Sequence, residues 1–250
     1  MSSILSLIAV CLFACIHLFI SKCRFLYGRH GHIWLSASSG VAIAYIFTHL
    51  LPDIASARIK YAELDGISGV IAEHLFLVTL FGLVIYYGFD RVAEFSRGYW
   101  TEDHHTSAKR LNVILHTIGF AVYNFLIGYL ITKIPRPGVE PLILITLIML
   151  VHFLGLDFHF REIERQFYDR WLRWILALSV TLGWITANLT YLSAFTKVIW
   201  FAFLTGAILI NTIKVELPDD EHARFWPFLV SIIVFTSIML VIEVFFPKTG

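Results

Sequence analysis

Long apolar blocks recur along the whole chain and constrain its fold more than any other feature. Crossing a hydrocarbon core of about 30 Å takes roughly 20 apolar residues per helix. The blocks here reach that length without the polar stripe of a soluble helix. We therefore predict an all-α, polytopic integral membrane protein with about eight transmembrane helices. Their expected positions are 4–20, 33–51, 71–89, 111–132, 141–160, 172–191, 194–213 and 225–246.

Composition leaves little room for structure outside the bilayer. The 250 residues are 58% hydrophobic and 15% charged, against about 25% charged residues in ordinary soluble proteins. We expect one transmembrane domain over residues 1–250, with the lipid bilayer as its main partner. The formal net charge of +1 gives no reason to expect a nucleic-acid partner. Only 188–197 separates the sixth and seventh blocks, which leaves seven helices as an alternative to eight.

Lysines and arginines are unevenly distributed between the loops. The loops after the first, third, fifth and seventh blocks hold thirteen of these residues, and the remaining loops and the C-terminal tail hold six. Basic residues favour the cytoplasmic side of a membrane. This bias puts both termini on the non-cytoplasmic side of a membrane that we expect to be the plasma (inner) membrane.

Two neighbouring blocks, 111–132 and 141–160, carry polar side chains of a kind that is costly in lipid and usually functional. At 100° per residue, His116 and Tyr123 share one stripe of the first helix, and His152 and His159 share one stripe of the second. Imidazoles and a carboxylate from facing helices suit Zn²⁺ or another first-row cation. Alternatively, these groups only form hydrogen bonds between helices, and His17 is expected to be a packing residue. The candidate metal ligands are His116, Asn124, His152, Asp157 and His159.

A short motif, Leu-Pro-Asp, follows both the second block, at 51–53, and the seventh block, at 217–219. The predicted topology runs these two helices in opposite directions. This favours an inverted repeat of three helices, 1–100 and 171–250, around the central pair 111–161, an arrangement common in secondary transporters. Alternatively, each proline simply ends a helix at the membrane surface.

Three segments resemble the second, third and seventh helices of the ZIP family of divalent-metal transporters. They are 40–53 (GVAIAYIFTHLLPD), 82–94 (GLVIYYGFDRVAE) and 206–221 (GAILINTIKVELPDDE). The resemblance covers nearly the whole chain at low identity. It implies eight helices, both termini outside, inverted three-helix repeats, a homodimer, and zinc or another divalent metal cation as the substrate.

The chain departs from the family in its ligand helices. The family's fourth helix has His-Asn and an acidic residue three positions later, whereas here Asn124 is preceded by Tyr123 and followed by Ile127 at those positions. A phenol titrates near pH 10 and isoleucine has no lone pair, so two ligands are missing. The family's His and carboxylate of the fifth helix correspond to His152 and Asp157. We therefore expect no zinc transport through a central two-ion site.

Three functional hypotheses follow from these patterns. The first is a ZIP-like membrane protein of the transporter class that moves a divalent cation at an altered or weakened metal site. The second is a non-transporting ZIP-fold membrane protein that acts as a sensor or partner subunit. The third, ranked last, is an intramembrane metal-dependent hydrolase, for which no nucleophile or second catalytic base is evident. We predict a protein that is not an enzyme, without catalytic residues or a cofactor other than a metal substrate.

Overall fold

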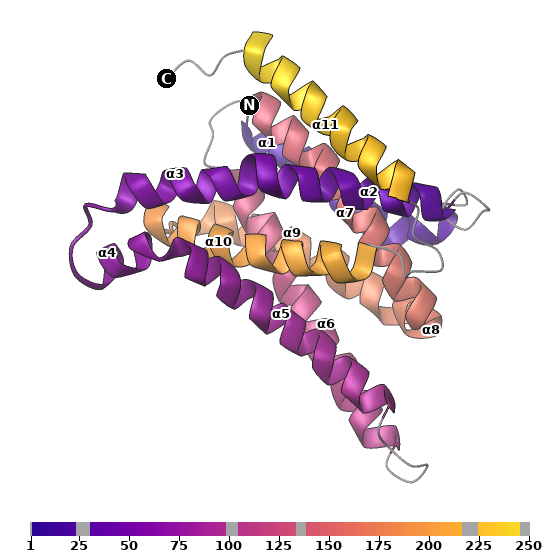
Figure 1. Cartoon of the computed structure of the whole chain (residues 1–250). Helices are drawn as coiled ribbons and strands as arrows, with labels where there is room; N and C mark the ends of the chain where they lie inside the picture. Colours follow the sequence, from indigo (N-terminus) through magenta and orange to yellow (C-terminus); the bar gives the residue numbers. More distant parts are fainter. Residues whose placement is uncertain (1, 24–30, 99–104, 134–138, 217–224, 246–250) are drawn as a thin grey trace.

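A computed structural model of the chain describes residues 2–23, 31–98, 105–133, 139–216 and 225–245 (Figure 1). All regular structure within these ranges is helical. In chain order the elements are α1 (Ser2–Phe19), η1 (Ile20–Lys22), α2 (Gly31–Tyr45), η2 (Ile46–Leu50), α3 (Leu51–Tyr61), α4 (Gly66–Glu73), α5 (Leu75–Gly98), α6 (His105–Leu130), η3 (Ile131–Lys133), α7 (Val139–Ile163), α8 (Arg165–Phe167), η4 (Tyr168–Leu172), α9 (Arg173–Leu189), α10 (Ala194–Asn211), η5 (Thr212–Glu216) and α11 (Phe225–Phe245).

Every predicted apolar block lies on helical structure. Six helical stretches of the described residues are long and apolar enough to cross a membrane: Ser3–Lys22, Ile33–Tyr61, Val113–Leu130, Leu142–Glu162, Arg165–Leu189 and Ala194–Lys214. The bent pair of α4 and α5 makes a seventh if it forms one span, and the apolar part of α11, Phe225–Val241, is shorter. The all-α class is confirmed, with six or seven helices able to span a membrane, while eight spans stay a prediction.

The second block continues through Pro52, contrary to the expectation that a helix ends there. Helical structure extends from Gly31 to Tyr61 through the π turn η2, and Pro52 lies in the first turn of α3. Proline lacks an N–H, and its ring crowds the carbonyl four residues earlier, that of Thr48. The wider π turn accommodates this crowding without ending the helix. The second Leu-Pro-Asp motif, 217–219, lies outside the described residues, but the π turn η5 precedes it directly.

The third block, predicted as one helix over 71–89, is broken at His74. There α4 and α5 meet at an angle of 71°, and His74 has non-helical backbone angles (φ −112°, ψ 28°). Its ring nitrogen Nδ1 lies 2.9 Å from the carbonyl oxygen of Val70. This side-chain hydrogen bond competes with the backbone bond that would continue the helix.

The limits of the sixth block differ slightly from those predicted. α7 ends at Ile163, and a new helical stretch begins at Arg165 and continues through η4 into α9. α9 ends at Leu189, and α10 begins after Ser193, whose hydroxyl oxygen accepts a 3.0 Å hydrogen bond from the backbone N–H of Thr196. A serine N-cap of this kind starts a separate helix. The sixth and seventh blocks are therefore two helices, as predicted.

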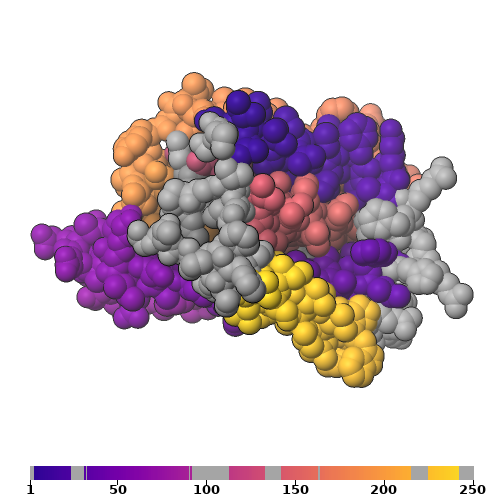
Figure 2. Space-filling view, turned by 90° about the horizontal axis from the view of Figure 1, so that it is seen from above, coloured from indigo at the N-terminus to yellow at the C-terminus, as the bar shows by residue number. Residues whose placement is uncertain are grey.

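Three helix pairs make the most extensive contacts: α6 with α9, α5 with α10, and α2 with α11. Glycines allow these backbones to approach closely. A Cβ atom at Gly206 would meet the carbonyl oxygen of Thr79 across the α5–α10 pair, and one at Gly128 would meet that of Val180 across the α6–α9 pair. α7 contacts α1 and α2. It lies in the middle of the view in Figure 2, with α11, in yellow, at the edge.

The outward-facing side chains of the helices are mostly large and apolar. In water they would form an extended hydrophobic surface of a kind that soluble monomers rarely show, whereas in a bilayer they face lipid. Examples, each at least half exposed, are Ile67, Phe81, Ile118, Leu147, Leu178 and Val230. Buried polar side chains occur on several helices, and those of His17, Asn124 and Asp157, on α1, α6 and α7, have no solvent exposure.

Candidate functional site

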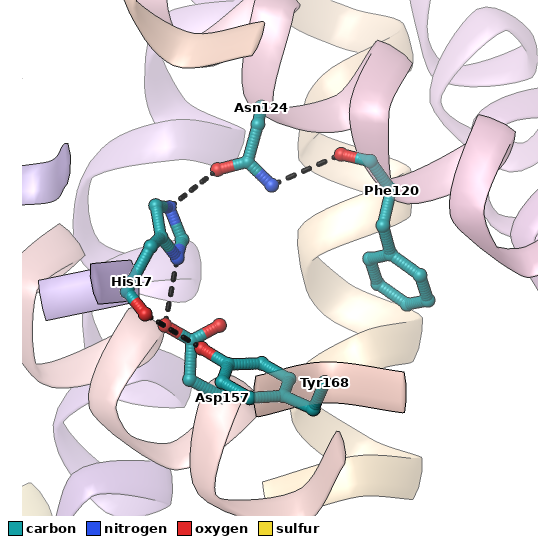
Figure 3. Close-up of polar contacts among 5 residues, drawn as sticks. All are labelled: His17, Phe120, Asn124, Asp157 and Tyr168. Carbon is teal, nitrogen blue, oxygen red and sulfur yellow. Dashed lines mark hydrogen bonds and ion pairs between the residues drawn. The ribbon is translucent and has the colours of Figure 1, made fainter. Parts of the chain in front are cut away.

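A fully buried polar network joins three helices (Figure 3). His17 from α1 lies between Asp157 from α7 and Asn124 from α6. Its Nδ1 is 2.7 Å from Oδ2 of Asp157, and its Nε2 is 2.8 Å from Oδ1 of Asn124. None of the three side chains has solvent exposure above zero. His17, expected to be a packing residue, is thus the bridge between two of the candidate ligands.

The hydrogen-bond partners define the protons of this network. Nδ2 of Asn124 donates to the carbonyl oxygen of Phe120 at 2.9 Å, so its Oδ1 faces His17 as an acceptor. Nε2 of His17 therefore carries a proton, and one further proton lies between Nδ1 and the carboxyl group of Asp157. Whether that proton is on the ring or on the carboxyl, the His17–Asp157 pair has no net charge. A neutral pair is far less costly to bury than a single charge.

The surroundings hold this network in place. The hydroxyl of Tyr168 donates to the backbone carbonyl of His17 at 3.1 Å, which gives a partner to a carbonyl near the C-terminal end of α1. Tyr168 begins the π turn η4, and the next residue, Asp169, accepts two hydrogen bonds from the guanidinium of Arg161, at 2.8 and 3.1 Å. Within the described residues, Oδ1 of Asp157 has no hydrogen-bond partner.

His152 belongs to a different contact. Its Nε2 lies 2.6 Å from the hydroxyl of Tyr123, and both side chains are almost completely buried. His152 and Asp157 are five residues apart on α7, which turns their side chains about 140° away from each other. The single metal site expected around them would require ligands from two sides of the helix.

The two remaining candidate ligands pack against aromatic neighbours. The ring of His116 lies 5.8 Å from that of Phe120, and the ring of His159 lies 6.3 Å from that of Phe160. Among the described residues there is no group of three or more His, Cys, Asp or Glu side chains that could hold a metal ion. The structure therefore brings Asn124 and Asp157 together through His17, and it does not gather the five candidates into one cluster.

A cavity of about 560 Å³ extends to His152 from one end of the helix bundle. Its exposed lining residues, Ser56, Lys60 and Ala194, lie where α3 ends and α10 begins, and this end is its mouth. Its inner end is formed by His152 of α7 and by residues of α2, α6 and α10. The remaining wall residues include Ile127, Ile131, Ile148, Met149, Leu204 and Ile208. Tyr123 and the hydrogen bond it shares with His152 lie directly behind this inner end.

Helical periodicity explains which side chains reach the cavity. On α3 the lining residues Asp53, Ser56 and Lys60 recur at intervals of three and four, and they follow the π turn η2. On α10, Lys197 lines the mouth in the first turn, and the lining continues at the same spacing to Ile208. Residues three and four apart share one helix face. Both helices therefore present one continuous face to the cavity.

A dehydrated divalent cation does not fit the central network. Oδ1 of Asn124 and Oδ2 of Asp157 are already hydrogen-bonded to His17, and both ring nitrogens of His17 are used in those bonds. Zinc in tetrahedral geometry needs about four ligands. Each side-chain atom that binds the metal must be free of a proton. Oδ1 of Asp157 alone cannot supply such a set. The chemistry available here is hydrogen bonding around one shared proton.

Sequence reasoning missed His17 and the charged residues of the cavity mouth. A histidine inside the first apolar block was itself a signal, because intramembrane polar residues are costly. Comparison with known proteins gives no further guide: no protein-family model, no curated protein and no solved structure matches this chain.

Proposed function

We propose that this protein is a membrane carrier of ZIP-like architecture. The observation that carries the proposal is the cavity that leads from the ends of α3 and α10 to His152 and stops there. A path open to one side and closed by buried side chains on the other is what a carrier needs in one of its two alternating states. In the orientation favoured by the basic loops, the mouth faces the non-cytoplasmic side.

The helix pairing supports an inverted repeat. In the inverted repeat, the first three blocks correspond in order to the last three, and α6 corresponds to α7. The α5–α10 pair is then equivalent to the α11–α2 pair. The α6–α9 pair is likewise equivalent to the α7–α1 pair. All four pairs are in contact. The π turns η2 and η5 also occupy equivalent positions before the two Leu-Pro-Asp motifs. These correspondences favour repeats at 1–100 and 171–250 around the central pair 111–161.

The substrate of this carrier is not expected to be a divalent cation held at the centre of the bundle. The central oxygens are occupied by His17, and Lys60 and Lys197 line the mouth of the cavity. A cation entering there meets positive charge before it meets any ligand. A homodimer in the plasma (inner) membrane, with both termini outside, remains the assembly that we propose from the resemblance and the loop charges.

A non-transporting relative is the second candidate. It is favoured by two short buried hydrogen bonds, because Tyr123–His152, at 2.6 Å, closes the inner end of the cavity and His17–Asp157, at 2.7 Å, joins α1 to α7. A protein that kept these bonds permanently would act as a sensor or partner subunit. The metal-dependent hydrolase has the least support, since its proposed residues are divided between separate contacts.

Thiol labelling separates the two candidates. In a background without Cys11, Cys15 and Cys23, Met149→Cys places a thiol in the cavity wall, and Ile143→Cys places one on the outer face of the same helix, where Ile143 is 48% exposed. A charged, membrane-impermeant thiol reagent is applied to right-side-out and to inside-out vesicles. A carrier gives labelling of Met149→Cys from both sides and none of Ile143→Cys. Labelling of Met149→Cys from one side only would identify the non-transporting protein.

The orientation has its own test. A cysteine introduced between residues 161 and 169 should react only from the cytoplasmic side, because this segment belongs to the basic set of loops. Labelling of such a cysteine from outside intact cells would reverse the proposed topology.

A further inference from the structure

We propose that the cavity binds an amphiphilic carboxylate, with its head group between Lys60 and Lys197 and its alkyl chain along α10 towards His152. This inference rests on the proposed function only in taking the cavity as the substrate path. It names the class of substrate that the lining favours.

The walls of the cavity fit an apolar chain. Val198, Phe201, Leu204 and Ile208 recur along the cavity face of α10. From Lys197 to Ile208 is eleven residues, which spans about 16 Å. Pockets of about 300–1,000 Å³ accommodate small ligands, and the 560 Å³ found here belongs to that range. An extended alkyl chain of medium length fits in this space and removes part of its apolar surface from water.

The mouth of the cavity favours an anion. Lys60 lies in the last turn of α3 and Lys197 in the first turn of α10. The N-terminus of a helix carries partial positive charge, and a lysine there is unfavourable for the helix. The lysine makes the electrostatic potential at this end more positive. Within the described part of the chain neither ammonium group forms an ion pair, and each lies over a tyrosine ring, Lys60 over Tyr61 and Lys197 over Tyr191. A carboxylate there is stabilised by the two ammonium groups, while the opposite partial charges at the start of α10 and the end of α3 largely offset each other.

The acidic side chain in the cavity does not reverse this preference. Asp53 lies seven residues before Lys60 on α3, about 10 Å deeper. It already interacts with another group of the protein. Of the three charged residues that line the cavity among the described ones, the two at the mouth are positive.

Two polar groups at the inner end are already hydrogen-bonded within the protein. The hydroxyl of Thr205 donates to the carbonyl of Phe201 at 2.9 Å, and Nε2 of His152 is hydrogen-bonded to Tyr123. These satisfied groups tolerate the end of an apolar chain. The ligand class is therefore an amphiphile with a single anionic head.

Binding of radiolabelled decanoate tests the proposal. The full-length protein is reconstituted in phosphatidylcholine nanodiscs, and bound label is measured by scintillation proximity against empty discs. Lys60→Gln with Lys197→Gln should weaken binding about five- to ten-fold, as expected for two partly exposed ion pairs. Arg58→Gln, an exposed position on α3 that does not line the cavity, should leave binding unchanged. Decyltrimethylammonium competing as well as unlabelled decanoate would overturn the proposal.

Two further arms identify the place and the source of the ligand. Ala57→Trp fills the cavity from α3 and should abolish binding, whereas Ala55→Trp, on the same helix outside the lining, should not. Equal binding by both variants would overturn the site. Binding that disappears when anionic phospholipid is added to the discs would assign the site to a bilayer lipid, and so overturn the free carboxylate. Decanoate binding tests the ligand, and thiol labelling from both sides tests the carrier. The two measurements are independent, so either proposal can fail while the other is still tested.

Discussion

The His17–Asp157 hydrogen bond gives the sharpest energetic prediction. Removing one partner of a buried ionic pair costs about 3–5 kcal/mol, whereas an average hydrogen bond between membrane helices contributes about 0.6 kcal/mol. His17→Leu should show the larger cost, because Asp157 then loses its 2.7 Å partner while its Oδ1 has none among the described residues. Asp157→Leu should cost less, because a neutral His17 keeps its hydrogen bond to Asn124.

The double variant His17→Leu/Asp157→Leu should recover much of that loss, since two leucines can pack against Phe153, whose ring lies 4.7 Å from that of His17. We expect a coupling energy of at least about 2 kcal/mol from the double-mutant cycle. The measurement is reversible unfolding by sodium dodecyl sulfate in mixed micelles, followed by tryptophan fluorescence. A coupling energy below about 1 kcal/mol would show that the bond is an ordinary interhelical hydrogen bond and that the shared-proton argument is wrong.

Three other predictions follow from the contacts described. Gly206→Ala should destabilise the protein by about 1–3 kcal/mol in the same unfolding assay, whereas Gly88→Ala, where a Cβ atom meets nothing within 4 Å, should unfold with a normal midpoint. Burial raises the pKa of the Cys23 thiol, so the pH at which its alkylation becomes fast should be higher than for a small free thiol. The rate is followed by mass spectrometry. Fast alkylation of Cys23 at the same pH as the free thiol, or at a lower one, would contradict this prediction. Tyr123→His with Ile127→Glu should create or strengthen zinc binding detectable by calorimetry, and zinc uptake by the unmodified protein in proteoliposomes should be slow or absent. Rapid uptake that His152→Ala abolishes would refute the argument from missing ligands.

Hydropathy predicts the helices well because each apolar block must satisfy its backbone internally in lipid. Hydropathy also predicts the weak division between the sixth and seventh blocks. In the structure, Ser193 caps the helix that begins at Ala194. It fails at Pro52 and at His74, where local backbone geometry decides. A π turn absorbs the proline, and a hydrogen bond from a side chain to the backbone breaks the helix at His74. Neither the π turn nor this hydrogen bond changes the hydropathy of its segment. Hydropathy therefore cannot predict either of them.

The candidate site could be predicted only in part. Asn124 and Asp157 were identified because they are polar residues inside apolar helices, and they do share one network. The partner of each could not be deduced, because reasoning within one helix pair omits α1, and His17 comes from there. His152 and Asp157 are grouped through the resemblance to the His and carboxylate of the fifth ZIP helix, but an interval of five residues separates them around the helix axis. The cavity mouth depends on how α3 and α10 pack, which no single segment encodes.

The distance along the chain between His17 and its partner has a consequence for biosynthesis. Asp157 follows His17 by 140 residues, and a ribosome adding 5–20 residues per second makes it about 7–28 s later. During this interval the first helix can already be in the membrane, yet the residue that pairs with its imidazole does not exist. The apolar remainder of α1 must hold the helix in the bilayer alone. The first helix to be made is thus among the last to be fixed in place, and its final position depends on a carboxyl group from the second half of the polypeptide.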